Sequence, residues 1–570
     1  MKKLLAVFFL LTQSIFAQTV FTPRGIGGGG ALFFPTINPN NPQDFYVSCD
    51  MSEMFHSTDF GHSYSVLPFT ELSVSNISTY EFTSDPLIAY SVYNDGNNSF
   101  PVKSTDGGNT WTTIAAYDLN NYGSVYMQKA NPSRSDQFIV GAYGDILITN
   151  DGGATFNLVK HASNMGAGII LGGVVWDGNS IYIGTNEGIL FSNNSGQSFS
   201  MMTTSGMTSG NVIWSFTGGR SGNTLRFCCI AGDIADTYNG LMPWDYWGYA
   251  KAVYVMDNAN GTWNLKSQSF NFATDFVMYA SMSASDANVI YLGGSDGNYG
   301  APLVYKSSDA GNTWAKVFNT TGNANIVTGW EGAGGDKTWG WSETCFGITA
   351  APSDPNYVLF STYSNVQSTT DGGANWKQAY VNSSDEHAAG ANTPKNMAYH
   401  SIGLENTTCW QVNWIDANTM MASFSDIGGI KSNDAGFSWG FQYSGFSVNS
   451  LYRTVVGANG NVYGACSNIH DMYQSTRLTD AILDANDANG KIVYSADNGQ
   501  TWQNLHVFNH PVFWLATDPN NANRMYASVI HFGGTQGSQL GGIYRCDDLN
   551  NLAASTWTKL SNPPRRKVTR

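Results

Sequence analysis

Short apolar runs alternate with polar turns along almost the whole chain. Several runs rich in β-branched and aromatic residues follow turns rich in Pro, Asn and Asp, as at 45–47, 358–360 and 525–527. Short runs bounded by turn residues are typical of β-strands. The nearest approach to helical periodicity, at 478–488, is short, and we predict a loop insertion there. The pattern therefore predicts a chain of many short strands.

An eight-residue turn recurs between these runs, with the form Ser/Thr-x-Asp-x-Gly-x-Ser/Thr-aromatic, and we call it the box turn. An aspartate in a tight turn accepts hydrogen bonds from the amides just ahead of it, and the glycine supplies a positive φ. We therefore predict that each box turn joins two strands and that its aspartate is structural. The clear copies are 57–64, 104–111, 149–156, 307–314, 369–376, 432–439 and 495–502, and weaker ones are 192–199, 255–263 and 545–557.

The spacing of the box turns predicts the architecture. Their aspartates, or the residues that replace them, stand at 59, 106, 151, 194, 257, 309, 371, 434, 497 and 547, so that successive intervals run from 43 (194 minus 151) to 63 (257 minus 194) residues. Each interval suits one four-stranded propeller blade, and ten markers are too many for one ordinary ring. We therefore predict an all-β fold of tandem β-propellers, with about seven blades in 18–400 and an incomplete second ring of about three blades in 401–570.

The start of the chain predicts export. Residues 1–17 comprise a Lys-Lys pair, an apolar run and a final Ala17, which together are typical of a secretory signal peptide of bacterial type. Later segments fall short of the roughly 20 apolar residues that a membrane helix needs. We therefore expect a secreted or cell-envelope protein without membrane insertion.

Composition narrows the class of protein and of ligand. The chain has 62 glycines, 14% aromatic and only 12% charged residues, which favours strands and turns over helices. A net charge of −15 argues against a nucleic-acid partner, because phosphates require clustered Lys and Arg. Seven scattered cysteines fit buried thiols better than a disulfide framework or a zinc site, although one or two disulfides remain open. We predict no metal and no other cofactor.

Two copies of the box turn are preceded by an additional aspartate. Asp50 stands nine residues before Asp59, and Asp426 stands eight residues before Asp434. Each additional aspartate follows an apolar strand, so we expect it at a strand end. A pair of carboxylates, one protonated and one ionised, can hydrolyse a glycosidic bond. Asp50 and Asp426 are therefore the candidate catalytic residues.

Two segments dense in tryptophan offer candidate sugar-binding surfaces. They are 329–346, which is also rich in glycine, and 243–249. Flat aromatic rings suit the apolar faces of sugars. The alternative is that these segments fold their rings onto a neighbouring blade. The candidate substrate-binding residues are Trp330, Trp339, Trp341, Trp244 and Trp247.

The two segments that carry the additional aspartates resemble the openings of the two propellers of glycoside hydrolase family 74, which cleaves xyloglucan. The first resemblance covers the glycine-rich residues 25–30 and the strand ending in Asp50, and the second covers 403–408 and Ser425-Asp-Ile-Gly-Gly-Ile430. The resemblance implies that Asp50 is the general base and Asp426 the general acid of an inverting reaction. Family members usually continue the first aspartate with x-Gly-Gly, whereas this chain has Met-Ser-Glu at 51–53.

The box turn itself is of the Asp-box (BNR) type, which sialidases and sortilin-type receptors also contain, so it identifies no reaction. A sialidase would need three arginines for the substrate carboxylate, and arginine is scarce in this chain. The sequence therefore favours a secreted glycosidase that cleaves β-1,4-glucan or xyloglucan-type polysaccharide. The alternative is a non-catalytic Asp-box propeller that binds glycans or proteins at the cell surface, with its protein partner unknown.

Overall fold

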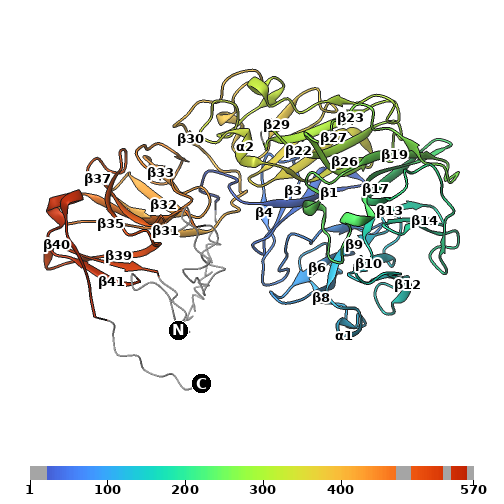
Figure 1. Cartoon of the computed structure of the whole chain (residues 1–570), viewed down its shortest axis with the longest axis horizontal. Coiled ribbons are helices and arrows are strands. Elements are labelled where there is room, and N and C mark those ends of the chain that lie inside the picture. The colour runs from blue at the N-terminus through green and yellow to red at the C-terminus, as the bar shows by residue number, and fades with distance from the viewer. Residues whose placement is uncertain (1–21, 299, 470–488, 531–540, 562–570) are drawn as a thin grey trace, which may run out of the picture.

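The computed structural model describes residues 22–298, 300–469, 489–530 and 541–561, and strands dominate them (Figure 1). The α-helices in this part of the chain are single turns, α1 (Leu119–Tyr122) and α2 (Trp339–Ser342). The predicted all-β class is confirmed. The predicted signal peptide, 1–17, and the predicted loop insertion at 478–488 lie outside the described residues.

Ten sheets follow one another along the described chain, eight with four strands and two with five. The first sheet shows the common pattern, in which consecutive strands pair antiparallel: β1 (Leu32–Asn38), β2 (Asn41–Cys49), β3 (Met54–Ser57) and β4 (Ser65–Val66). Short strands pair with their neighbours in sequence because each pair is joined by a tight turn. This is the blade pattern that the box spacing predicts.

The first seven sheets surround a central channel of about 350 Å³. Strand β1 packs against β26 and against β27 (Asp354–Thr362), which places the first sheet beside the seventh. The predicted limits of the two propellers stay a prediction, and the eighth sheet begins with β30 (Ala398–Tyr399). The strands that line the channel are β1, β5 (Glu81–Phe82), β9 (Val125–Ala130), β13 (Leu171–Asp177), β17 (Asn211–Ser221), β21 (Asp275–Met282) and β26 (Cys345–Ala351).

The last three sheets form a row beside the first seven, coloured orange to red in Figure 1. Their first long strands, β31 (Cys409–Trp414), β35 (Ser450–Val456) and β39 (Val512–Asp518), pack in that order. On the tenth sheet Trp514 and Ile543 are 47% and 43% exposed, whereas Leu515, which follows Trp514 on the same strand and points to the opposite face, is buried. One face of the tenth sheet is thus covered by the ninth sheet, and the other is exposed within the described chain.

The box turns are held together by hydrogen bonds from within each turn. In the box of 104–111, Ser104 Oγ donates to Asp106 Oδ1 (2.9 Å), and Thr110 donates its N–H to Oδ1 (2.9 Å) and its hydroxyl to Oδ2 (2.7 Å). The amide of Gly108 donates to Ser104 Oγ (2.8 Å). The same bonds recur around Asp434, where Ser432 and Ser438 are the partners. The carboxylates of these aspartates therefore accept hydrogen bonds from residues of their own turns, as predicted for a structural aspartate.

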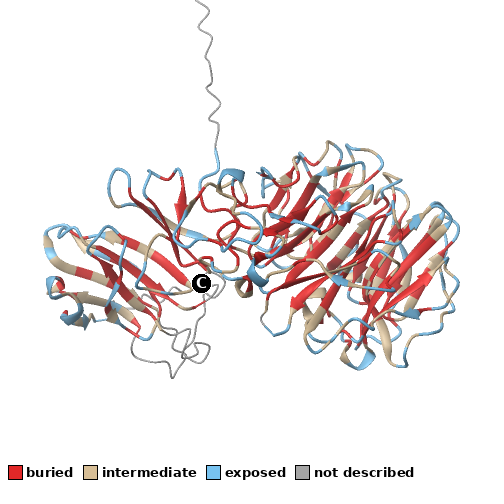
Figure 2. Cartoon of the chain, turned by 90° about the horizontal axis from the view of Figure 1, so that it is seen from above, coloured by how far each residue is buried: buried red, intermediate tan, exposed pale blue. Residues whose placement is uncertain are grey.

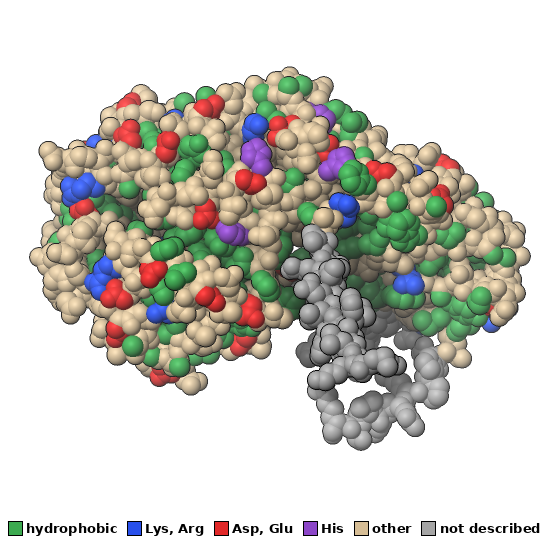
Figure 3. Space-filling view, turned by 180° about the vertical axis from the view of Figure 1, so that it is seen from behind, with side chains coloured by type: hydrophobic (Ala, Val, Ile, Leu, Met, Phe, Trp, Pro, Cys, Tyr) green, Lys and Arg blue, Asp and Glu red, His purple; other side chains and the backbone are tan. Residues whose placement is uncertain are grey.

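Buried residues lie mainly in the strands, between neighbouring sheets, and exposed residues lie mainly in the loops (Figure 2). All seven cysteines are described and all are free thiols. Six are buried and Cys409 is exposed, which agrees with the interpretation of the cysteines as core residues. On the face seen in Figure 3, basic side chains are few and lie scattered among acidic ones. The absence of a nucleic-acid partner stays a prediction.

The two aspartates at 426 and 434 are expected to affect stability very differently. Asp434→Ala removes three hydrogen bonds to Ser432 and Ser438, and it should lower the free energy of unfolding by about 1–3 kcal/mol. Asp426→Asn should have a much smaller effect, because asparagine tolerates the left-handed backbone at that position (φ +64°). Urea unfolding followed by fluorescence measures both. Equal losses would contradict the structural interpretation of the box aspartate.

Candidate functional site

A cavity of about 410 Å³ lies where the first seven sheets meet the eighth, and we call it the junction cavity. Its wall is formed by the N-terminal glycine segment, by strand ends of both groups of sheets, and by the helix α2. The side chains that carry its chemistry are those of Asp50, Glu343, Tyr363, Asp426, Trp341 and Asn449.

Asp50 directly follows strand β2, whose last five residues are buried. The buried run anchors the strand, and the chain then turns so that Asp50 itself is exposed. Cys49 lies behind it, with its thiol 3.7 Å from Asp50 Oδ1. Burial, and then the charge of Asp50, raises the pKa of the Cys49 thiol well above its usual range, so Cys49 stays a neutral thiol.

Asp426 lies in a tight turn between β32 (Met420–Phe424) and β33 (Gly429–Ser432). Its backbone is left-handed (φ +64°), a conformation that costs a residue with a Cβ about 1 kcal/mol or more. Its amide donates to Asn449 Oδ1 (3.4 Å), and the next side chain, Ile427, is buried. The turn therefore points Asp426, which is half-buried, into the junction cavity.

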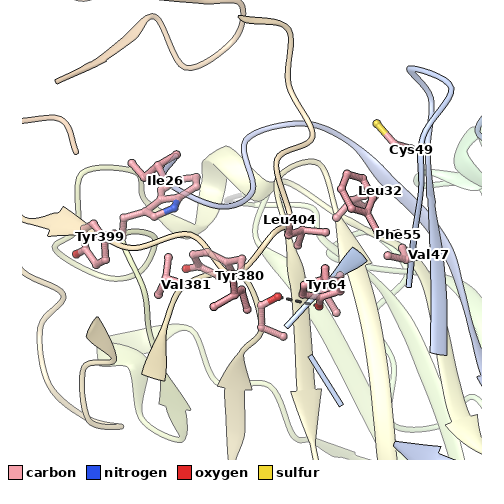
Figure 4. Packing of buried hydrophobic residues seen from close by; sticks show 14 of the residues in the cluster. Ile26, Leu32, Val47, Cys49, Phe55, Tyr64, Tyr380, Val381, Tyr399 and Leu404 are labelled. Atoms are coloured by element: carbon pink, nitrogen blue, oxygen red, sulfur yellow. Dashed lines mark hydrogen bonds between the residues drawn. The ribbon is translucent and has the colours of Figure 1, made fainter. Parts of the chain in front are cut away.

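The two aspartates are 376 positions apart (426 minus 50), and both line the junction cavity. Residues 25–30 bring the two regions together, because they run between the first seven sheets and the eighth. The amide of Gly28 donates to Leu404 O (2.6 Å) and that of Gly29 to Ser364 O (2.7 Å). Ile26 and Leu404 belong to one buried cluster with Tyr380 and Tyr399 (Figure 4).

This crossing requires glycine at two positions. A Cβ on Gly27 would lie 1.8 Å from the carbonyl oxygen of Tyr380, and a Cβ on Gly30 would lie 1.8 Å from that of Asn406. Gly27 also has a left-handed backbone (φ +71°). The backbones approach too closely for any side chain, so the glycine-rich opening of the sequence has a packing reason.

Trp341 is the one predicted substrate-binding tryptophan that lines the junction cavity. It is half-buried, and its ring centroid lies 5.6 Å from that of Trp330. The ammonium of Lys337 lies 5.3 Å from the centroid of the Trp341 ring. Burial lowers the pKa of Lys337, and the negative charges of Asp336, Glu331 and Asp426 oppose this shift. A ring with one face toward a cavity can support a sugar.

The other four predicted tryptophans belong to the core. Trp330 is fully buried and donates its Nε1–H to Gly27 O (2.9 Å), and Trp339 is buried and donates to Asn323 Oδ1 (2.7 Å). Trp244 and Trp247 are half-buried and pack against the core between sheets. These rings have partners inside the protein and do not line the junction cavity. Their placement matches the alternative in which the segments fold onto neighbouring sheets.

Glu343 and Tyr363 are among the cavity residues that were not predicted from the sequence. Glu343 caps the C-terminus of α2 with a left-handed backbone (φ +57°), and its side chain is exposed. Tyr363 lines the cavity beside α2, and its amide donates to Ser342 O (3.4 Å). Burial, followed by the charges of Glu343 and Asp50, raises the pKa of Tyr363. Tyr363 therefore remains a protonated hydrogen-bond donor. Glu343 is visible in the Gly/Trp segment, but neither residue belongs to a motif.

A fully buried carboxylate, Glu331, lies behind the cavity wall. Its oxygens accept hydrogen bonds from Ser342, Ser364 and Asn365. Burial raises the pKa of Glu331 to about 7, although these hydrogen bonds oppose the shift. The carboxyl group thus changes its charge near neutral pH.

Within the described residues, no group of three or more His, Cys, Asp or Glu side chains is arranged to hold a metal ion. None of the helices in the same residues has the length and apolar character needed to cross a membrane.

The raised pKa of Glu331 predicts how stability depends on pH. The folded protein holds this proton up to about pH 7, whereas an unfolded chain loses it near 4.5, so stability falls as pH rises between these values. Glu331→Gln removes this loss. The difference in free energy of unfolding between Glu331→Gln and wild type should therefore shift in favour of the variant by on the order of 3 kcal/mol from pH 4.5 to 7.5. Urea unfolding at each pH measures this difference.

Glu187 provides a control, because its pKa is lowered in the folded protein whereas that of Glu331 is raised. Burial would raise its pKa, but hydrogen bonds from Lys160 and Ser163 outweigh burial and lower it. Its contribution to stability is therefore present above the unfolded pKa and is lost as pH falls. Glu187→Gln should be most destabilising near neutral pH. Parallel pH curves for wild type and Glu331→Gln would contradict the assignment of a buried, titrating Glu331.

Comparisons with known proteins identify the fold. Neither a protein-family model nor a curated protein sequence matches this chain. Among solved structures, an ancestral GH74 enzyme matches with a TM-score of 0.61 and 16% identity over 95% of this chain and 78% of that one. The GH74 enzyme of Niastella koreensis matches with a TM-score of 0.55 and 16% identity, over 94% of this chain and 86% of that one. The GH74 xyloglucanase of Xanthomonas campestris matches with a TM-score of 0.52 and 13% identity, over 94% of each chain. The chain therefore has a β-propeller fold like that of GH74 enzymes.

Proposed function

We propose that this protein is an exported glycoside hydrolase that cleaves β-1,4-linked glucan of the xyloglucan type. The observation that carries the proposal is that Asp50 and Asp426, far apart in the sequence, line one cavity together with Trp341. The likeness of the fold to GH74 enzymes supports it. A polysaccharide is the expected ligand, and a cavity lined by three carboxylates suits an uncharged one.

The proposed reaction proceeds with inversion. The carboxyl of Asp426 protonates the glycosidic oxygen as the bond to the anomeric carbon breaks, and the carboxylate of Asp50 takes a proton from the attacking water. An inverting pair stands roughly 6.5–9.5 Å apart so that water fits beside the sugar. The exposed position of Asp50 gives water access to the base. Trp341 would stack on a neighbouring sugar ring.

One observation favours a second candidate, a propeller that binds glycans without cleaving them. Met51 follows Asp50, lines the cavity and packs against the buried cluster, with its sulfur 3.3 Å from the Thr408 hydroxyl. In family 74 the aspartate is usually followed by x-Gly-Gly. This chain has Ser52 and Glu53 at the two glycine positions. Of these loop residues Met51 lines the cavity directly beside the proposed base.

Replacing either carboxylate tests the catalytic proposal. Asp50→Asn and Asp426→Asn should each reduce the release of reducing ends from xyloglucan by about 10²–10⁴-fold, because each removes a proton-transfer group. Glucan binding, measured by affinity electrophoresis, should persist in both variants. The matched control is Asp434→Asn, a box aspartate outside the cavity, which should keep wild-type turnover at a temperature where it is folded.

The wild-type protein separates the two candidates. If it binds xyloglucan or mixed-linkage β-glucan but releases no reducing ends, the binding propeller is the better description. If it does neither, both candidates are refuted. Retention of configuration at the anomeric carbon, detected by NMR of the first product, would refute the inverting assignment of Asp50 and Asp426.

A further inference from the structure

One side of the wall of the junction cavity is formed by two short segments. One is α2, a single helical turn that presents Trp341 and is followed by Glu343. The other is the turn 362–365, which presents Tyr363. A helix of one turn has no intrinsic stability in water, and Glu343 adds a strained left-handed backbone. Bonds from elsewhere must therefore hold α2. The turn 362–365 has bonds of its own, from Thr362 N to Asn365 O (2.9 Å) and from Ser364 N to Thr362 Oγ1 (3.1 Å), and it can serve as the fixed side.

Glu331 supplies such a bond to α2 from behind the wall. The hydroxyl of Ser342, the last residue of α2, donates to Glu331 Oε1, while Ser364 Oγ (2.8 Å) and Asn365 Nδ2 donate to Oε2. Ser342 and Ser364 also contact each other through their hydroxyls (3.0 Å). The carboxyl group of Glu331 thus joins the two segments, because Oε1 binds α2 and Oε2 binds the turn 362–365.

The joined residues stand next to the cavity residues in the sequence. Ser342 lies between Trp341 and Glu343, and Ser364 directly follows Tyr363. A displacement of either serine would therefore carry a cavity side chain with it. All three partners of Glu331 are fully buried, so water does not compete for these bonds. A buried polar group that loses its hydrogen-bond partner is costly, because no water replaces that partner.

The same cluster is tied to the glycine segment that closes the junction. Ser364 accepts a hydrogen bond at its carbonyl oxygen from Gly29 N (2.7 Å), and Trp330, adjacent to Glu331, donates to Gly27 O (2.9 Å). The Glu331 cluster therefore connects α2, the turn 362–365 and residues 25–30. These are the elements that frame one side of the junction cavity.

We propose that Glu331 is a positioning residue of the junction cavity, which fixes Trp341 and Tyr363 relative to each other through Ser342 and Ser364. The effect on substrate binding rests on the proposed glycosidase function, whereas the effect on the cavity wall does not. Glutamine can replace Glu331 in this role. Its amide N–H can donate to Ser342 Oγ, and its amide oxygen can accept from Ser364 and Asn365.

The test uses serine variants that cut the connection without emptying the core. Ser342→Ala and Ser364→Ala should each raise KM for a xyloglucan oligosaccharide about fivefold to tenfold and leave kcat within about twofold, because each loses one buried hydrogen bond behind the wall. Glu331→Gln should keep the wild-type KM. The matched control is Ser283→Ala, which removes another buried serine bond, to Ala351 O (2.7 Å), away from the cavity.

A second readout does not require activity. The fluorescence of Trp341 is isolated by measuring each variant with and without the additional substitution Trp341→Phe and taking the difference. Acrylamide quenching of this Trp341 signal should increase in Ser342→Ala and Ser364→Ala, but not in Glu331→Gln or Ser283→Ala. Unchanged quenching in both serine variants would overturn the proposal, as would a KM for Glu331→Gln as high as that for Ser342→Ala. If wild type neither binds nor cleaves glucans, the proposed function fails, and the quenching result alone decides whether Glu331 positions the wall.

Discussion

The close crossing of residues 25–30 between two groups of sheets is the constraint on which the rest of the molecule depends. Backbone oxygens of Tyr380 and Asn406 approach Gly27 and Gly30 so closely that any Cβ would clash. The hydrogen bonds of the crossing reach Ser364 on one side and Leu404 on the other. Together with the direct bond from Tyr64 N to Ile402 O (2.8 Å), this crossing fixes the eighth sheet against the first seven and gives the junction cavity its shape.

Much of the fold could be predicted because its signals are local. The aspartate of a box turn finds its hydrogen-bond partners within eight residues, as Asp106 does with Ser104 and Thr110. The residues that form these bonds can therefore be recognised in the sequence. Strand pairing between neighbours follows from these turns. Long-range pairing leaves no such signal. The parallel pair of β25 (Ile326–Val327) with β29 (Trp376–Gln378) joins residues about 50 positions apart, and the sequence does not indicate it.

The candidate site was predictable where it departs from the repeat. Asp50 and Asp426 stand out because other box turns lack an additional aspartate in that place, and the structure brings both to one cavity. The tryptophans were harder to interpret, because core packing and sugar binding favour the same side chain. Burial separates Trp330 from Trp341, and it depends on how the Gly/Trp segment folds against residues 25–30. Sequence spacing carries no information about that contact.

Several residues around the junction cavity have a strained backbone although they are not glycine. Asp426 and Glu343 both have left-handed backbones (φ +64° and +57°), as does Ser52, two residues after Asp50 (φ +87°). Glycine would relieve each position of about 1–2 kcal/mol. A turn whose only purpose is to reverse the chain would be most stable with glycine, as Gly428 illustrates (φ +75°). Box turns outside the cavity also contain such residues, for example Ala310 (φ +64°) and Ala435 (φ +60°), so strain alone does not mark a functional residue. What distinguishes Asp426 and Glu343 is that both strained positions line one cavity together with Asp50.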